Sequence, residues 1–236
     1  MKKSYDIVVI GAGPAGVVAS LHASKNGVNT ALIEVTDIVG VPVRCGEFIP
    51  SITSIRNLLP HAENIERIYS LIPNRALSNR IKLMKFYSPD SHPFEFKFDG
   101  LVLNREFVGQ AIVDKAKERG ADVYTSCVAT NLREKGDMKQ VLVKRPEGET
   151  VFETKIVIAA DGFPSNVGIW AGMKSGYGPK DIVLTMQNKM TAVEIEEDAV
   201  EMYVGNRYSP GGYAWIIPKG GGVANVGLGI RLSHFR

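Results

Sequence analysis

The stretch from Tyr5 to Glu34, YDIVVIGAGPAGVVASLHASKNGVNTALIE, constrains the fold more than any other part of the chain. A short apolar run predicts a buried strand, and it leads directly into the glycine-rich sequence GAGPAG at positions 11–16. Helix-forming residues follow as far as Asn26, Gly27 stops the helix, and a second short strand ends at the acidic residue. Strand, glycine turn, helix and strand in this order predict a βαβ unit that binds a dinucleotide.

The glycines of this turn have separate physical roles. Gly11 allows the tight turn out of the strand, Gly13 lets a pyrophosphate approach the backbone, and Gly16 lets the helix pack close to the strand. The first helical turn, which contains Ala15, leaves N–H groups unpaired at the positive end of the helix dipole, so it can bind a diphosphate without a basic side chain. Glu34 follows the last glycine by 18 residues, where its carboxylate can accept bonds from ribose hydroxyls and would repel the 2′-phosphate of NADP.

The composition excludes several classes of protein. The 236 residues allow one large domain or two small ones, and a net charge of +3 gives no argument for a nucleic-acid partner. No apolar run approaches the roughly 20 residues of a transmembrane helix. The two cysteines, Cys45 and Cys127, do not make a disulfide framework. We therefore expect an intracellular protein, and we expect no metal site.

Residues 36–50 are rich in glycine and proline and predict a loop after the second strand. Its centre is Arg44-Cys45-Gly46-Glu47. A cysteine beside an arginine in a glycine-flanked loop can be activated or directed at a ligand. A buried structural cysteine with an incidental arginine has equal weight at this point.

The middle of the chain predicts a second sheet. Residues 51–59 predict a short helix, and the ranges 66–72, 81–87 and 94–98 predict strands. In the last of these, Phe94, Phe96 and Phe98 alternate with charged residues, which indicates an antiparallel sheet with the aromatic side chains in its core.

Residues 104–120 predict an amphipathic helix that begins next to Arg105. A cation is unfavourable at a helix N-terminus, so Arg105 is a candidate partner for an anion, with a solvated arginine as the alternative. Residues 121–128 predict a strand that ends at Val128, and the ranges 141–144 and 151–155 predict a hairpin.

A buried strand predicted for residues 156–160 leads into Asp161-Gly162, and Ser165 can cap the helix that follows. At this position the Asp161 carboxylate and the backbone at Gly162 could bind the hydroxyls and phosphates of a ligand. An Asp-Gly turn is common in proteins, so alone it does not indicate a site. Residues 181–192, 199–204, 208–218 and 222–232 predict further strands. Tyr213 and Trp215 share one face of their strand, as a substrate wall or as core.

Together these signals resemble the flavoproteins of the p-hydroxybenzoate hydroxylase fold. The glycine turn with Glu34, and Asp161-Gly162 with Ser165, are similar to their nucleotide motifs. The sequence Arg44-Cys45-Gly46-Glu47 resembles the cysteine-bearing flavin loop of geranylgeranyl reductases. Tyr213-x-Trp215-x-Ile217-Pro218 is similar to their YxWxFP substrate-cavity motif, with isoleucine where phenylalanine is usual.

The resemblance implies an α/β (α+β) fold. A Rossmann-like FAD-binding domain, residues 1–75 and 99–175, would carry an inserted antiparallel substrate-binding sheet, residues 76–98 and 176–236. Cys45 would be the catalytic group near the flavin, with Tyr213 and Trp215 against the substrate. The implied FAD-binding residues are Gly11, Gly13, Ala15, Gly16, Glu34, Arg44, Cys45, Gly46, Arg105, Val128, Asp161 and Gly162.

The implied activity is the saturation of C=C bonds in geranylgeranyl chains of membrane glycerophospholipids by reduced FAD. Electrons would come from an external donor, NAD(P)H or a ferredoxin-type protein. A lipid substrate implies a cytoplasmic protein that contacts the inner face of the membrane peripherally. An FAD-dependent aromatic monooxygenase and a non-catalytic nucleotide-binding remnant are the alternatives.

Members of this family continue beyond this length, with another Gly-Asp flavin motif and a largely helical C-terminal part. We therefore expect a truncated chain that lacks the C-terminal part of the family and binds flavin with reduced affinity. Tight, stoichiometric FAD on the purified 236-residue chain would contradict that expectation.

Overall fold

The computed structural model describes residues 4–173 and 176–235, and the chain divides into two compact units. The first unit contains residues 1–43 and 106–175, and the second contains residues 44–105 and 176–236. The expected boundaries differ from this division, because they assign residues 44–75 and 99–105 to the dinucleotide-binding domain. In the structure these segments include strand residues that pair within the sheet of the second unit.

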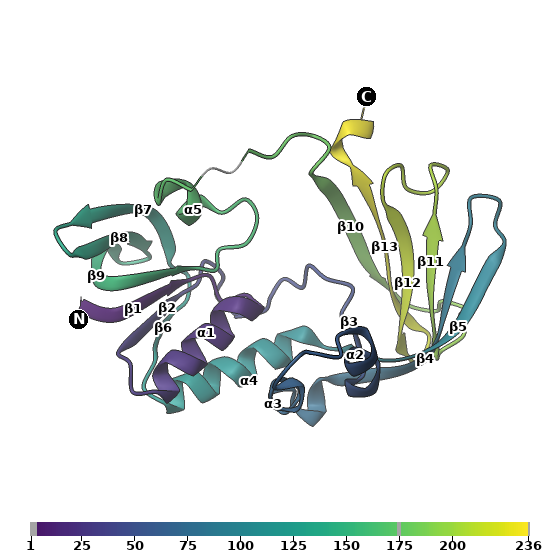
Figure 1. The fold of residues 1–236 in the computed structure, drawn as a ribbon, viewed down its shortest axis with the longest axis horizontal. Helices are drawn as coiled ribbons and strands as arrows, with labels where there is room; N and C mark the ends of the chain where they lie inside the picture. The colour runs from purple at the N-terminus through teal and green to yellow at the C-terminus, as the bar shows by residue number, and fades with distance from the viewer. Residues whose placement is uncertain (1–3, 174–175, 236) are drawn as a thin grey trace. The chain divides into compact units, whose positions relative to one another are not determined.

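The first unit is built on a six-stranded sheet with the order β6-β2-β1-β9-β8-β7 (Figure 1). Its strands are β1 (Ser4–Ile10), β2 (Thr30–Ile33), β6 (Asp122–Tyr124), β7 (Val128–Lys135), β8 (Met138–Arg145) and β9 (Gly148–Ala159). Four neighbouring strands, β6, β2, β1 and β9, run parallel to one another. The strands β9, β8 and β7 form an antiparallel meander. The parallel part is the sheet of the predicted βαβ unit.

Side chains of β1 are buried on both faces of this sheet, as a parallel strand between two layers requires. Val8 and Ile10 join a core with the fully buried Phe152, and α5 (Asn166–Trp170) packs against the same core. Val9 points to the opposite face, where α1 (Pro14–Lys25) contacts the sheet. Figure 1 shows α4 (Arg105–Glu118) on the same side as α1.

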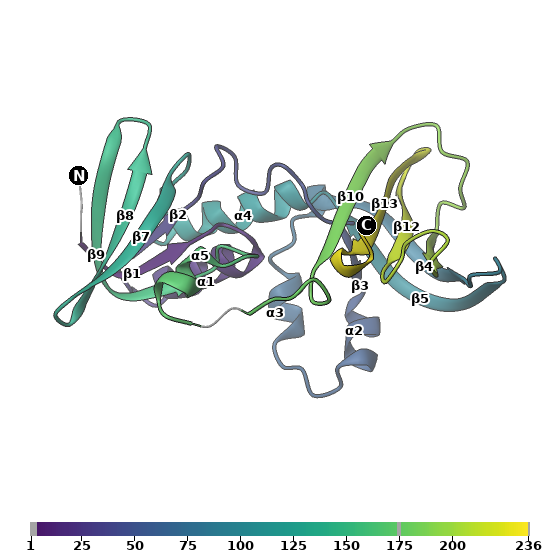
Figure 2. The same cartoon turned by 90° about the horizontal axis from the view of Figure 1, so that it is seen from above.

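The second unit is a seven-stranded sheet with the order β10-β13-β12-β11-β4-β5-β3. Both views show most of its strands side by side (Figures 1 and 2). Its strands are β3 (Phe48–Pro50), β4 (Leu77–Tyr87), β5 (Pro93–Leu103), β10 (Val183–Met190), β11 (Ala199–Val204), β12 (Tyr213–Gly220) and β13 (Val223–Arg231). Its helical segments are α2 (Ile52–Leu58), α3 (Ile65–Tyr69) and the 3-10 turns η1 (Asn74–Ala76) and η2 (Leu232–His234). The pairing is antiparallel except between β11 and β4, which run parallel, so the predicted antiparallel sheet contains one parallel pair.

Several predicted strands are wrong in their type or extent, and residues 151–155 and 156–160, predicted as separate strands, form the single strand β9, which ends at Ala159. Residues 66–72 overlap α3, which begins after Asn64 in a left-handed conformation and carries its large apolar side chains at helical spacing on Ile65, Ile68 and Tyr69. Residues 121–128 form not one strand but β6 and the start of β7. Ser126, with φ of 52°, interrupts them.

Two predictions of burial are also wrong. Phe94 and Phe96 are 64% and 46% exposed, because β3 pairs only with the far end of β5 and leaves this part of β5 at the sheet edge. Ile156, predicted within a buried strand, is 52% exposed on β9. Among the residues that the structure describes, no helix has the length and apolar character needed to cross a membrane.

Candidate functional site

In the glycine turn of the first unit, backbone packing requires glycine at positions 11 and 16 but not at position 13. A Cβ atom at Gly11 would lie 2.3 Å from the carbonyl oxygen of Ala160, and one at Gly16 would lie 1.8 Å from the carbonyl oxygen of Gly11. Both glycines are therefore required by close backbone packing. A Cβ atom at Gly13 would meet no atom within 4 Å.

Gly13 is the N-cap of α1, with extended backbone angles (φ −65°, ψ 179°) that any residue can adopt. Neither packing nor backbone conformation demands a glycine there. Gly13 and Ala15 are exposed at the N-terminus of the helix, where unpaired N–H groups favour an anion. These residues fit a dinucleotide diphosphate, because the space that a Cβ at Gly13 would enter is left open.

Glu34 lies directly after β2 and is only 9% exposed. Its Oε2 accepts a bond from the backbone N–H of Ala12 (2.6 Å), and its Oε1 accepts from the N–H (2.9 Å) and the hydroxyl (2.8 Å) of Thr36. A carboxylate offers about four acceptor positions, so Oε2 can still accept one ribose hydroxyl. Val128 lies at the same sheet end, because the N–H of Cys127 donates to the carbonyl oxygen of Glu34 (2.9 Å).

The Asp161 carboxylate supports the start of α5. Its Oδ1 accepts from the hydroxyl of Ser165 (2.7 Å), its Oδ2 accepts from the N–H of Val167 (3.0 Å), and the Ser165 hydroxyl accepts from the N–H of Gly168 (3.0 Å). Ser165 is thus the predicted N-cap. Gly162 is exposed with φ of 79°, a left-handed conformation that suits glycine.

In the second unit, the cysteine loop lies against the large sheet. The side-chain amide of Gln187 donates to the carbonyl oxygen of Cys45 (3.0 Å) and accepts from the indole N–H of Trp215 (2.9 Å). A Cβ at Gly46 would lie 2.7 Å from Cδ1 of Ile217, so the loop approaches this face closely. The structure therefore brings Cys45, Gly46 and Trp215 together.

Two arginines of the predicted site have different positions. Arg105 is half-buried at the start of α4, and its backbone N–H donates to Oε1 of Glu47 (2.9 Å). Arg44 is exposed. Tyr213 and Trp215 lie on one face of β12, as their spacing predicts, with ring centroids 5.7 Å apart.

Three residues of this region were not predicted as site residues: Glu47, Lys219 and Asn225 are 5%, 6% and 2% exposed, and Lys219 and Asn225 each contact Glu47. A signal for one of them was present. Lys219 continues the alternation of Tyr213, Trp215 and Ile217. The alternation therefore places its positive charge on the same sheet face as these three apolar side chains.

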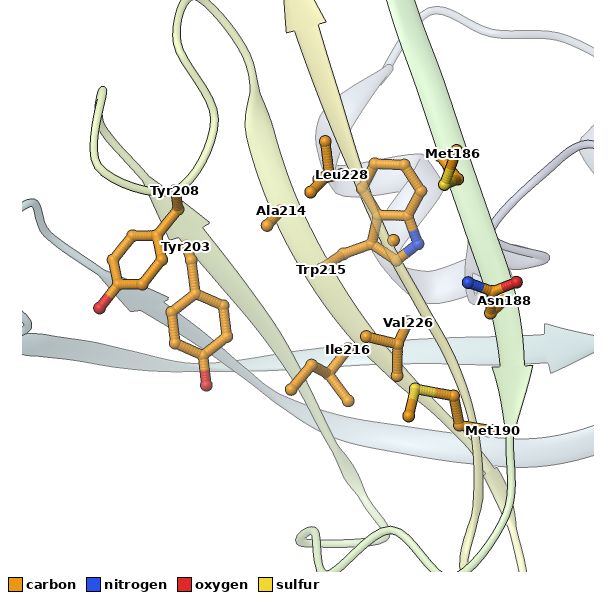
Figure 3. A pocket seen from close by; sticks show the side chains of 11 residues that line it. Met186, Asn188, Met190, Tyr203, Tyr208, Ala214, Trp215, Ile216, Val226 and Leu228 are labelled. Atoms are coloured by element: carbon orange, nitrogen blue, oxygen red, sulfur yellow. The ribbon is translucent and has the colours of Figure 1, made fainter.

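The opposite face of the same sheet carries an apolar hollow of about 340 Å³. Strand register places Met186, Leu228, Ala214 and Tyr203 in one row on this face, and Gln187 and Trp215 in the alternate row. Figure 3 shows Tyr203 and Tyr208 beside one another, away from the β10 side chains. Burial and the hydrogen bond to Glu201 raise the pKa of the Tyr203 phenol. The lining residues are Met186, Asn188, Met190, Tyr203, Tyr208, Ala214, Trp215, Ile216, Val226, Gly227 and Leu228.

Two family profiles match parts of the chain. Residues 181–236 match the profile described as "Geranylgeranyl reductase catalytic domain", and residues 6–86 match "Glucose inhibited division protein A". The digeranylgeranylglycerophospholipid reductase of Methanocaldococcus jannaschii is 39% identical over 231 residues, which cover 96% of this chain and 56% of that protein. The chain thus spans little more than half of this relative's length.

Solved structures agree with these similarities. A geranylgeranyl bacteriochlorophyll reductase-like protein from Thermoplasma acidophilum superposes with a TM-score of 0.84 at 31% identity, over 99% of this chain and 59% of that chain. A flavin-dependent halogenase (TM-score 0.70, 22% identity, 99% of this chain and 42% of that chain) shares the fold alone. The resemblance to geranylgeranyl reductases found in the motifs is confirmed: the chain is similar to these proteins over nearly all of its own length and over little more than half of theirs.

Proposed function

We propose that this chain is part of an FAD-dependent reductase that saturates the C=C bonds of geranylgeranyl chains on glycerophospholipids. The observation that carries the proposal is the loop of Cys45, which is hydrogen-bonded through Gln187 to Trp215 on the large sheet. The loop that carries the thiol is thereby held against the sheet face that presents Trp215, which suits the binding of an apolar alkene. The name of the Methanocaldococcus relative supports the lipid class.

The first unit supplies the nucleotide-binding part of this function. Gly13 and Ala15 at the start of α1 would hold the diphosphate of FAD, and Glu34 would accept a ribose hydroxyl. Gly11, Gly16, Val128, Asp161 and Gly162 would complete this site. FAD, when bound and reduced by an external donor such as NAD(P)H or a ferredoxin-type protein, would supply a hydride.

The second unit supplies the proton and the apolar surface. An isolated alkene resists hydride addition unless a proton arrives as charge develops, so the Cys45 Sγ–H is the proposed donor to the second carbon. The thiolate then recovers a proton from solvent. Tyr213 and Trp215 would position the chain and exclude water, and Arg44, Gly46 and Arg105 would contact the flavin. A lipid substrate places the enzyme at the membrane surface as a peripheral protein.

The test uses the 236-residue chain, dithionite-reduced FAD and a digeranylgeranyl glycerophospholipid, with the products analysed by mass spectrometry. We expect products heavier by two hydrogens per saturated bond, and Cys45→Ser should lower the yield at least tenfold. An oxygenated product that forms only in air would establish a monooxygenase instead. FAD binding without any product would indicate a nucleotide-binding remnant.

A further inference from the structure

A buried ion pair lies directly beside the cysteine loop. The side chains of Glu47 and Lys219 form a salt bridge and are 6% and 4% exposed. Lys219 Nζ also donates to the carbonyl oxygen of Leu103 (3.0 Å). Charges buried to this degree are retained in proteins only when they are paired and hydrogen-bonded, and both conditions hold here.

Further hydrogen bonds tie Glu47 and the neighbouring Gly46 to the sheet. Asn225 Nδ2 donates to Oε2 of Glu47 (3.0 Å) and to the carbonyl oxygen of Gly46 (3.1 Å). The N–H of Arg105 donates to Oε1 of Glu47 (2.9 Å), and the N–H of Leu103 donates to the Glu47 carbonyl oxygen (2.9 Å). Glu47 is therefore fixed through its side chain and its main chain together.

This anchoring determines what the Cys45 sulfur contacts. The backbone N–H of Glu47 donates to Sγ of Cys45 (3.4 Å). Glu47 has φ of 66°, a left-handed conformation that a non-glycine residue keeps only where its surroundings enforce it. Because Sγ accepts this N–H, the hydrogen of the thiol is directed elsewhere.

We propose that the Glu47–Lys219 pair is a positioning device for Cys45. The pair holds Glu47 in its left-handed conformation, keeps its N–H on Sγ, and so keeps the thiol hydrogen in directions that point away from that N–H. The relevance of this direction to alkene reduction rests on the proposed function of Cys45. The positioning itself does not, because it concerns only contacts within the second unit.

Stability alone gives little reason for such a pair. A buried ion pair is often no more stabilising than apolar side chains of similar volume, because desolvation offsets the attraction. An apolar pair at positions 47 and 219 could fill the same space, but it could not accept the N–H of Arg105 or the amide of Asn225. The ion pair therefore gives the loop a single geometry.

The experiment uses the 236-residue chain without flavin or substrate, so its outcome is independent of FAD binding and of reductase activity. One readout is the exchange rate of the Glu47 amide hydrogen, measured by NMR. The other is the infrared S–H stretching band of Cys45, isolated as the difference from Cys45→Ser. The main variant is Lys219→Met. Glu47→Gln is a milder change that serves if Lys219→Met does not fold, and Lys219→Arg keeps the positive charge. The matched control is Lys85→Met, which removes an ion pair with Glu196 from the same sheet.

We expect exchange of the Glu47 amide to accelerate at least tenfold in Lys219→Met, with a shifted and broadened S–H band. Glu47→Gln should show the same changes to a smaller degree. Lys219→Arg, which keeps the charge, should restore both readouts, and Lys85→Met should alter neither. If the pair had a merely structural role, its substitution would lower the stability of the chain, while the S–H band and the exchange rate of the Glu47 amide would stay at parental values. That result in either Lys219→Met or Glu47→Gln would overturn the proposal.

Discussion

Two single-methyl substitutions in the glycine turn should separate folding from nucleotide binding. In Gly16→Ala the new Cβ would lie 1.8 Å from the carbonyl oxygen of Gly11, whereas real Cβ contacts essentially never fall under 3.0 Å. The start of α1 must therefore move by more than 1 Å against backbone that cannot yield locally. Overpacking of this kind costs about 1–3 kcal/mol, and here the clash is with main chain, so we expect the upper part of that range.

Gly13→Ala is the matched change, because its Cβ meets no atom within 4 Å and its φ of −65° suits alanine. The folded chain should tolerate it with a stability close to that of the parent, because the entropic gain of about 0.4–1 kcal/mol is offset by the poorer N-cap that alanine makes for α1. The same methyl group would enter the space proposed for the diphosphate. We expect the Kd for FAD to rise at least about tenfold, equivalent to roughly 1.4 kcal/mol.

The assay combines urea denaturation followed by circular dichroism with FAD titration followed by flavin fluorescence. Gly16→Ala should lose stability and FAD affinity together, while Gly13→Ala should lose affinity alone. The reasoning would be refuted if Gly13→Ala bound FAD as tightly as the parent chain. It would be refuted equally if Gly16→Ala were as stable as the parent.

Three further predictions concern single side chains. Glu34→Gln should weaken FAD binding about tenfold in fluorescence titrations, because an amide oxygen accepts a ribose hydroxyl more weakly than a carboxylate oxygen does, and it should also cost stability, because the amide NH2 would face the N–H of Thr36; unchanged affinity would contradict a ribose contact. Ser165→Ala removes the N-cap of α5 and should lower the free energy of unfolding by about 1 kcal/mol in urea titrations, an effect that Ser165→Thr should largely avoid because its hydroxyl can still donate to Asp161 and accept from the N–H of Gly168. Burial, and hydrogen bonds with Tyr124 and then Asp122, raise the pKa of the Tyr5 phenol, so the unfolded chain releases this proton first and stability should fall as pH rises above about 10. Denaturation of Tyr5→Phe between pH 9 and 11 should show a shallower fall, and an unchanged slope would contradict this account.

The parts of the fold that were predicted correctly depend on local sequence. The βαβ unit, α4 and the strands β11 to β13 each carry their periodicity or their turn residues within a short segment. The N-cap Ser165 was predictable for the same reason, because the hydroxyl and the N–H that it accepts are three residues apart.

The errors arise where distant pairing decides the outcome. Phe94 and Phe96 have the alternation of a half-buried strand, but their exposure depends on how far β3 extends along β5, which the alternation does not encode. The segment 66–72 is apolar at positions that fit either period over so short a range, and the left-handed Asn64 starts a helix instead.

The two halves of the proposed site differ in the same way. Gly13 is recognisable because close backbone packing accounts for Gly11 and Gly16 but not for Gly13. The approach of a ligand would account for a glycine at that position. Glu47 and Lys219 lie 172 residues apart, and although the place of Lys219 in an apolar series indicates a buried cation, the sequence does not show which anion pairs with it. Their pairing follows only once β12 places Lys219 on the face that the cysteine loop covers. A cation within an alternating apolar series therefore predicts a buried anionic partner, and acidic residues next to a glycine, such as Glu47, are the first candidates for that partner.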